Sequence, residues 1–145
     1  MRIIAAHVIP EDIKRFYLGW AKDNFSLNNL DLGKNLLVKA DCREWIANQK
    51  GTFDLIFLDP PTFSNSKSMM GTWDVQRDYV EMLNQVSRLL GKNGVLLFST
   101  NNRKFKLDQD SLPNLHFQGL SSELLPPDFA RNPKIHQVWK IQRMN

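Results

Sequence analysis

An unbroken apolar run that ends in an acid and a rigid turn constrains the fold of this chain more than any other feature. Residues 53–58 read FDLIFL, and Asp59, Pro60, Pro61 and Phe63 follow. A continuous apolar run predicts a strand covered on both faces, as in a parallel sheet. In open α/β sheets the ligand site lies beyond the carboxyl ends of such strands. We therefore expect the active site at this turn.

The turn combines hydrogen-bond acceptors with a flat ring. Pro60 and Pro61 fix φ near about −65° and remove two backbone donors, so the nearby carbonyls can face a ligand. Asp59 adds a carboxylate, and Phe63 adds an aromatic face. A flipped-out nucleobase needs this combination, because its polar edge is hydrogen-bonded while its face stacks. The alternative is a strand-ending loop with Phe63 packed underneath.

Strand and helix patterns alternate along the rest of the chain. We expect strands over residues 2–9, 35–40, 94–100, 115–122 and 136–143. We expect helices over residues 13–27 and 43–48, and over 75–90 with Asp74 as cap and Gly91 as the end. This order predicts a doubly wound α/β sheet with a β-rich tail.

The composition predicts one globular domain of a cytoplasmic protein. The 145 residues are 42% hydrophobic, which suffices for one core. Cys42 is the only cysteine, so an intramolecular disulfide is excluded and neither a thiolate cluster nor any other metal site is expected. The opening MRIIAAHVIP is soon interrupted by Pro10, Glu11 and Asp12, which argues against a signal peptide or a membrane span.

Positive charge gathers toward the end of the chain. The net charge is +4, and residues 101–145 hold seven basic residues against four acidic ones. The run NNRKFK, residues 101–106, places amide and cationic donors around Phe105, as in a surface that contacts phosphates and bases. A solvated loop is the alternative for this run.

Four blocks, in this order, resemble the C-terminal methyltransferase domain of the bacterial bifunctional 23S ribosomal RNA methyltransferases K/L: DLIFLDPPTFSNSK, WDVQRDY, FSTNNRKFKLD and DFARNPKIHQVWKI. The resemblance runs from about Asp12 to the end of the chain. It implies a Rossmann-like class I methyltransferase fold, S-adenosyl-L-methionine as cofactor, 23S ribosomal RNA as partner, and methylation of a guanine at ring nitrogen 7. Methylation at a guanine exocyclic nitrogen is the alternative.

The resemblance also implies roles for single residues. Asp12 would bind the ribose hydroxyls of the cofactor, Asp41 would accept from the adenine amine, and the Cys42 amide would donate to the adenine ring. Both acids precede apolar-periodic stretches, so helix capping is an alternative for each. Asp59, Pro60, Pro61 and Phe63 would face the cofactor methyl and the guanine. The implied RNA contacts are Ser64, Asn65, Lys67, Arg77, Asn101, Arg103 and Arg131.

The reaction type places few demands on the side chains. Ring nitrogen 7 already presents a lone pair, so in-line transfer needs alignment, which can supply about 7–11 kcal/mol, and no general base. Methylation of cytosine carbon 5 would need a cysteine nucleophile, and Cys42 lies in the presumed adenine segment instead. We expect structural roles for the three histidines, His7, His116 and His136.

One part of the methyltransferase pattern is missing. Enzymes of this class bind the methionine end of the cofactor with a glycine-rich turn after the first strand, and residues 1–10 hold no glycine. We therefore expect residues 1–145 to be the C-terminal part of a single domain that lacks its first strand, with a hydrophobic slot in the sheet. An upstream methyltransferase chain or domain would fill that slot. A residual RNA-binding module and an inactive remnant are the alternatives.

Overall fold

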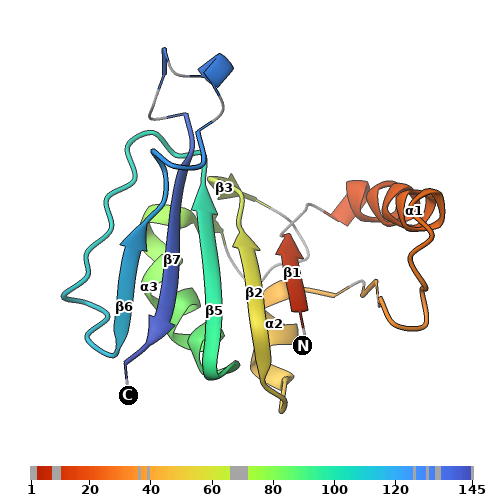
Figure 1. Cartoon of the computed structure of the whole chain (residues 1–145), viewed down its shortest axis with the longest axis horizontal. Coiled ribbons are helices and arrows are strands. Elements are labelled where there is room, and N and C mark those ends of the chain that lie inside the picture. Colours follow the sequence, from red (N-terminus) through yellow and green to blue (C-terminus); the bar gives the residue numbers. More distant parts are fainter. Residues whose placement is uncertain are drawn as a thin grey trace.

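A computed structural model of the chain describes residues 3–7, 11–35, 37–38, 40–65, 72–125, 127–129, 131–132 and 135–144, with side chains from Tyr17 onward. The main feature is a mixed five-stranded sheet in the order β1-β2-β5-β7-β6 (Figure 1). Its strands are β1 (Ile3–His7), β2 (Phe53–Asp59), β5 (Leu90–Thr100), β6 (Leu115–Gly119) and β7 (Gln137–Arg143). The predicted α/β class is confirmed.

The first three strands of the sheet are parallel and the last two are antiparallel. β1 and β5 run parallel to β2, whereas β7 runs antiparallel to both β5 and β6. Leu58 is paired with Phe98, and Thr100 is paired with Gln137. The carboxyl ends of β2 and β5 and the start of β7 therefore share one edge of the sheet, which we call the carboxyl edge.

Three α-helices and a small hairpin complete the described structure. The helices are α1 (Glu11–Leu27), α2 (Cys42–Asn48) and α3 (Val75–Ser87), and a 3-10 helix, η1, spans Pro127–Phe129. The hairpin pairs β3 (Phe63–Ser64) with β4 (Trp73–Asp74). Figure 1 shows α2 and α3 behind the sheet, while α1 lies to one side of it.

The core lies between α3 and one face of the sheet. Helix α3 contributes Tyr79, Met82, Leu83 and Val86, all buried, as its periodicity predicts. Alternate residues of the central strands meet this helix, and they are fully buried: Ile56, Leu58, Leu96 and Phe98. Burial at about 25 cal/mol per Å² of apolar surface makes this layer the main source of stability.

The other face of the central strands is less well covered. Phe57 is 39% exposed, and Leu55, Val95 and Leu97 are half-buried. The prediction that residues 53–58 are covered on both faces is therefore wrong for the described structure. The physical reason is that α2 and α3 pack together on one face, and α1 does not pack over the other.

Three further predictions need correction. No strand is present at the described residues of the range 35–40, although Leu36 and Lys39 lie outside them. Helix α3 ends at Ser87, so it is shorter than predicted, and Gly91 lies within β5 instead of closing the helix. β5 begins at Leu90, opposite Phe53, and its register with β2 shifts before Leu55 pairs with Val95. In this irregular stretch Gly94 passes close to β2, and a Cβ there would lie 2.8 Å from the Phe53 carbonyl oxygen.

The predicted slot beside β2 is also absent from the described sheet. β1 pairs with β2 along its whole length, from Ile3 opposite Leu55 to His7 opposite Asp59. The predicted lack of the domain's own first strand and glycine-rich turn stays a prediction. The other predicted elements, including the helix after Pro10, the helix over 43–48 and both C-terminal strands, are confirmed within a few residues.

Candidate active site at the carboxyl edge

Asp59 is fixed at the carboxyl edge by the neighbouring strand. It is the last residue of β2, and the hydroxyl of Ser99 on β5 donates a hydrogen bond to its Oδ1 over 2.5 Å. Ser99 is fully buried, so this bond forms in a protected environment. The carboxylate of Asp59 therefore has a defined position at the carboxyl edge. Ser99, on β5, is a candidate site residue that the sequence analysis did not identify.

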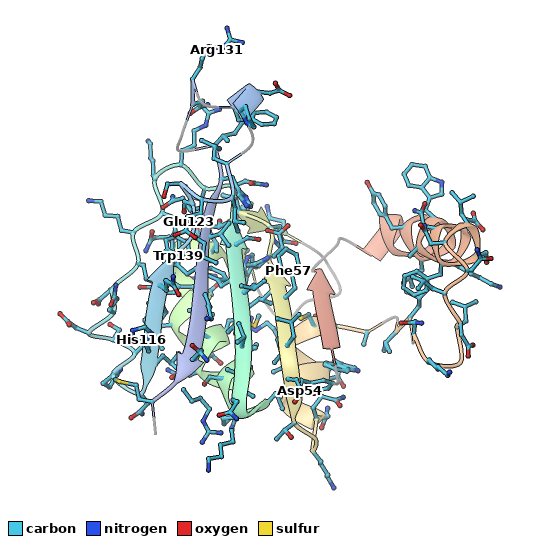
Figure 2. All side chains as sticks on the ribbon, viewed as in Figure 1. Asp54, Phe57, His116, Glu123, Arg131 and Trp139 are labelled. Atoms are coloured by element: carbon cyan, nitrogen blue, oxygen red, sulfur yellow. The ribbon has the colours of Figure 1, made fainter. Side chains whose placement is uncertain are left out.

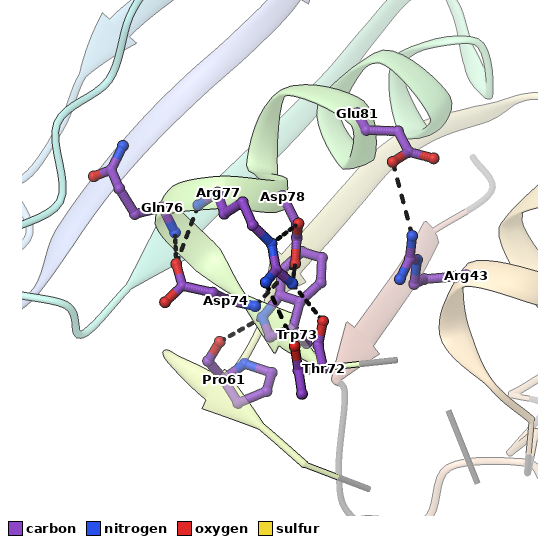
Figure 3. Close-up of polar contacts among 9 residues, drawn as sticks. All are labelled: Arg43, Pro61, Thr72, Trp73, Asp74, Gln76, Arg77, Asp78 and Glu81. Carbon is purple, nitrogen blue, oxygen red and sulfur yellow. Dashed lines mark hydrogen bonds and ion pairs between the residues drawn. The ribbon is translucent and has the colours of Figure 1, made fainter. Parts of the chain in front are cut away.

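The proline turn is held from below by a tryptophan. The indole Nε1 of Trp73 donates to the Pro61 carbonyl over 2.8 Å (Figure 3). The Val75 amide donates to the Thr62 carbonyl over 3.1 Å. These two carbonyls are thus committed to the fold, contrary to the expectation that the turn leaves its carbonyls to a ligand. Among the described residues no donor to the Pro60 carbonyl is found, and Pro60 itself is buried.

Phe63 presents its ring to solvent. Its exposed fraction is 53%, whereas Trp73, on the paired strand β4, is only 1% exposed. The alternative in which Phe63 packs beneath the turn is therefore wrong, since the buried aromatic at this place is Trp73. The signal for it was available, because Trp73 opens the WDVQRDY block.

Asp41 caps the N-terminus of α2, which confirms the helix-capping role that the sequence offered as an alternative for this residue. Its Oδ1 accepts from the amides of Arg43 (2.9 Å) and Glu44 (3.2 Å). The neighbouring Cys42 packs against the core, and burial, with the Asp41 carboxylate as a second cause, raises the pKa of its thiol to about 11. The thiol is therefore protonated at neutral pH and is a poor nucleophile. This agrees with the argument that the chain does not methylate carbon 5 of cytosine.

Arg77 is engaged in holding the hairpin to α3. Its guanidinium binds both carboxylate oxygens of Asp78, each over 2.7 Å, and also the Thr72 carbonyl (Figure 3). The hydrogen bond from Arg77 lowers the pKa of Asp78, and that carboxylate also accepts from the Asp74 amide. The predicted RNA contact at Arg77 would therefore have to use an arginine that already has a structural role.

The basic loop after β5 is anchored to α3. The side-chain amide of Gln76 bonds both the amide and the carbonyl of Lys106, over 2.8 and 3.0 Å, and the Tyr79 hydroxyl accepts from the Asp108 amide over 2.9 Å. Phe105 is buried, with its ring centroid 4.9 Å from that of Tyr79. The expectation that Phe105 belongs to a base-contact surface is wrong, because this ring is part of the core.

Asn101 and Arg103 help to line an open pocket beside this loop. Its volume is about 570 Å³, and its wall also includes Leu124, Phe129 and His136. Nδ1 of His136 lies 3.4 Å from Oδ1 of Asn101. The pocket is at the carboxyl edge, because Asn101 follows β5 and His136 precedes β7.

The remaining predicted contacts are spread over several environments. Ser64 is buried in the hairpin, whereas Asn65 is exposed directly after it. Arg131 is exposed, and Figure 2 shows it far out on the loop beyond the sheet. Asp12 lies in the first turn of α1, but its side chain is outside the described part, as is the whole of Lys67.

Two negative findings concern the described residues. No described helix has the length and apolar character that a membrane crossing requires. No group of three or more His, Cys, Asp or Glu side chains that could hold a metal ion occurs in the part of the chain that the structure describes.

Comparison with known proteins defines the class of this fold and site. Residues 2–131 match the S-adenosylmethionine-dependent methyltransferases, and the chain belongs to that family. The crystal structure of SMU.776 complexed with SAH aligns with a TM-score of 0.67 and 25% identity, over 83% of this chain and 35% of that one. A SAM-dependent methyltransferase from Agrobacterium tumefaciens shares the fold, with a TM-score of 0.62 and 14% identity over 99% of this chain and 56% of that one.

More similar sequences carry one particular name, ribosomal RNA large subunit methyltransferase K/L. The Magnetococcus marinus protein of that name is 51% identical over 133 residues, which are 90% of this chain and 18% of the relative. The protein of that name from Syntrophotalea carbinolica is 47% identical over 139 residues, 96% of this chain and 20% of the relative. The chain thus spans about a fifth of the length of these relatives.

The residues present fit one side of an S-adenosylmethionine site. Asp59 offers a fixed carboxylate at the carboxyl edge, and Asp41 offers another at the start of α2. The methionine end of the cofactor needs a backbone that approaches closely, and the first glycine of the chain is Gly19, within α1. The fit is therefore to the adenosine and substrate side.

Proposed function

We propose that the domain to which this chain belongs transfers a methyl group from S-adenosylmethionine to ring nitrogen 7 of a guanine in 23S ribosomal RNA, in the cytoplasm. The observation that carries the proposal is the turn from Asp59 to Phe63, where a carboxylate fixed by Ser99 and an exposed aromatic ring lie at the carboxyl edge. The names of the relatives support ribosomal RNA as the substrate class.

The turn can recognise guanine by its edge and its face. The Pro60 carbonyl and the Asp59 carboxylate are acceptors, and the Watson–Crick edge of guanine offers N–H donors to them. Phe63 would stack on the base, which is worth about 1–3 kcal/mol. With that edge held, ring nitrogen 7 on the opposite edge remains free to accept the methyl group without loss of a proton.

Residues of this chain would hold the adenosine part of the cofactor. The bound cofactor supplies an activated methyl group on a positively charged sulfur. Asp41, while capping α2 with Oδ1, would accept from the adenine amine with Oδ2, and the Cys42 amide would donate to the ring. Asp12 would bind the ribose hydroxyls. A preceding methyltransferase segment, in the same or another chain, would supply the glycine-rich turn.

A second candidate reaction uses the same turn. Acceptors beside an exposed ring can also hold an amine and draw off its charge, so methylation at the exocyclic nitrogen of guanine is the alternative. A residual RNA-binding fragment without transfer activity is the other alternative, since the substrate side is built more fully than the cofactor side.

The test is a chimera in which this chain replaces the matched 133 residues of the Magnetococcus marinus relative. Incubation with S-adenosylmethionine and unmodified 23S ribosomal RNA should yield 7-methylguanosine in nucleoside mass spectrometry. Asp59→Ala should abolish that product, Phe63→Ala should lower its yield about 5- to 150-fold, and Phe63→Tyr should retain it because a flat ring remains. Phe57→Ala, at an exposed aromatic on the open sheet face, is the matched control.

Each possible failure has a distinct meaning. An exocyclic methylguanosine that disappears with Asp59→Ala would favour the alternative reaction. RNA binding by the chimera without any transfer that depends on Asp59 would favour the RNA-binding fragment. The isolated 145-residue chain should bind S-adenosylmethionine weakly or not at all in calorimetry, because it lacks the glycine-rich turn. Tight binding there would contradict this division of the cofactor site.

A further inference from the structure

We propose that the pocket lined by Asn101, Arg103, Leu124, Phe129 and His136 binds an unstacked RNA nucleotide that neighbours the methylated base. The inference rests on the proposed function for the identity of the RNA, but the pocket is a separate site with its own residues. Its volume of about 570 Å³ lies within the range of about 300–1,000 Å³ that small-ligand pockets have.

The wall of the pocket is mainly apolar, with Leu125 and Ile135 beside Leu124 and Phe129, and it carries polar groups on one side. Phe129 is 46% exposed, and Leu124 is an exposed apolar residue on the same loop. The polar groups of the wall follow the end of β5, where Asn101 provides an amide and Arg103 a guanidinium. Single-stranded RNA is recognised by this combination, because aromatic rings stack on its bases while amides and guanidinium groups bond base edges and phosphates.

The polar side of the pocket is built on a fixed frame. Thr100 is paired with Gln137, and the Gln137 side chain donates to the Asn102 carbonyl over 2.9 Å. Asn101 and His136 are therefore held next to the paired ends of two adjacent strands, directly after β5 and directly before β7. The 3.4 Å separation of Asn101 Oδ1 from His136 Nδ1 is long for a hydrogen bond, so either group can exchange this contact for a ligand at little cost.

The aromatic side is shaped by local turns. The Leu124 amide donates to the Leu120 carbonyl over 3.0 Å, and the Asn132 amide donates to the Phe129 carbonyl over 2.8 Å. Figure 1 shows that this loop, with η1, rises beyond the carboxyl edge of the sheet. The ring of Phe129 lines the pocket and keeps part of its surface exposed.

The position of the pocket favours a nucleotide over the other candidate occupants. Asn101 lies two residues beyond Ser99, which bonds Asp59, so the pocket adjoins the proposed guanine site. It lies on the β7 side of Asp59, away from β1 and the segment that would bind the cofactor. Arg103 in the wall and Arg131 on the same loop favour a polyanion, although Glu123 and Asp128 also lie on this loop.

The test uses the 145-residue chain and a fluorescein-labelled single-stranded RNA of nine nucleotides with a central guanine, followed by fluorescence anisotropy. Phe129→Ala should weaken binding about 5- to 150-fold, the range that corresponds to the loss of one stacked base. Phe129→Tyr should bind like the unchanged chain. Phe57→Ala, the matched exposed aromatic outside the pocket, should also bind like the unchanged chain.

Salt dependence separates stacking from phosphate contact. Arg103→Ala should reduce the slope of log affinity against log salt by about 0.7, whereas Phe129→Ala should leave the slope unchanged. Equal affinity of Phe129→Ala and the unchanged chain would overturn the proposal, and so would the absence of any RNA binding. If the pocket instead binds an occupant of another class, such as a protein segment, Phe129→Ala and the unchanged chain should bind RNA with equal affinity.

The test is independent of catalysis. If RNA affinity depends on Phe129 while the chimera makes no methylguanosine, the nucleotide pocket stands and the proposed reaction fails. If the chimera makes 7-methylguanosine and Phe129→Ala changes neither RNA affinity nor the KM for RNA, the reaction stands and the pocket proposal fails.

Discussion

The region from Thr72 to Met144 and the region from Glu11 to Gln49 differ sharply in how they are held. The first contains most of the core, and its helix α3 buries residues from Val75 to Ser87 against the sheet. The second contains α1, where Tyr17 and Trp20 pack edge to face, at 5.7 Å between ring centroids, and both are exposed. An apolar helix face that remains exposed in water gains little stability from tertiary packing.

The difference follows the division of labour in the proposed site. Asp59 and the pocket are fixed by β5, β7 and α3, all within this chain. The positions proposed to bind the ribose and the adenine, Asp12 and Asp41, belong to the less well-held region. If the proposed roles hold, the RNA side of the site is the part that is well packed within this chain, and the cofactor side is the part that is less well packed.

The largest expected effect is the loss of the buried tryptophan Trp73, compared with the exposed tryptophan Trp20. Trp73→Ala should lower the free energy of unfolding by about 3–5 kcal/mol, because it empties a buried site and leaves the Pro61 carbonyl without its donor. Trp20→Ala, at a residue that is 52% exposed, should change it by less than about 0.5 kcal/mol. Urea unfolding followed by circular dichroism measures both. Equal effects would remove the contrast between the two regions.

The next effect concerns the bond that positions Asp59. Ser99→Ala should cost about 1.5–3 kcal/mol of unfolding free energy, because a hydrogen bond to a carboxylate is lost in a buried place. In the chimera the same change should lower kcat for methyl transfer, since Asp59 is no longer held. Ser111→Ala, at an exposed hydroxyl that also donates to a carboxylate, is the control and should cost less. A larger cost at Ser111 would contradict the assignment.

A smaller effect is expected at the helix cap of the well-held region. Asp74 accepts from the amides of Gln76 and Arg77 over 2.8 and 3.1 Å, and Asp74→Ala should cost about 1 kcal/mol. Asp31 makes a similar bond to the Gly33 amide, over 2.8 Å, in an exposed turn of the other region. Asp31→Ala should leave the unfolding midpoint unchanged in the same urea titration. A shift as large as that of Asp74→Ala would show that this turn also belongs to the cooperative structure.

The smallest effect is a pH dependence at Asp78. Because Arg77 lowers the pKa of this carboxyl in the folded state, its stabilisation is present above the unfolded pKa of about 3.9 and is lost as pH falls below it. Because Arg77 is exposed, the contribution of the Arg77–Asp78 ion pair to the free energy of unfolding should stay below about 1 kcal/mol and decrease as salt is added. Asp78→Asn should flatten the stability curve between about pH 4 and pH 2, in urea titrations at each pH. An unchanged curve would show that the pair contributes nothing.

The regular elements were predictable because their signals are local. The periodicity of α3 and the cap at Asp74 need only neighbouring residues, and both are confirmed. The end of α3 was predicted too late, because Leu89 and Leu90 continue the apolar pattern although the chain has already turned into β5. A pattern of burial does not distinguish a helix from a strand when both are buried.

The site was predictable in part for a similar reason. The position of Asp59 after an apolar strand follows from the sequence, and so does the cluster of polar residues after β5. The roles of the aromatic residues did not follow, because Phe63, Phe105 and Trp73 differ in burial through contacts with distant segments. The pocket was also missed, since Phe129 and Asn101 meet only when β7 returns beside β5.

From the amino-acid sequence alone the α/β class and the methyltransferase family could be predicted, together with a candidate site at the end of the strand over residues 53–58. These depend on the order of residues along the chain, which carries the periodicity and the motifs. Only the tertiary structure decided that Trp73 is buried while Phe63 is exposed, that Ser99 holds Asp59, and that a pocket forms between the end of β5 and the loop before β7. Burial and contact between distant segments arise from packing, and no local pattern specifies them.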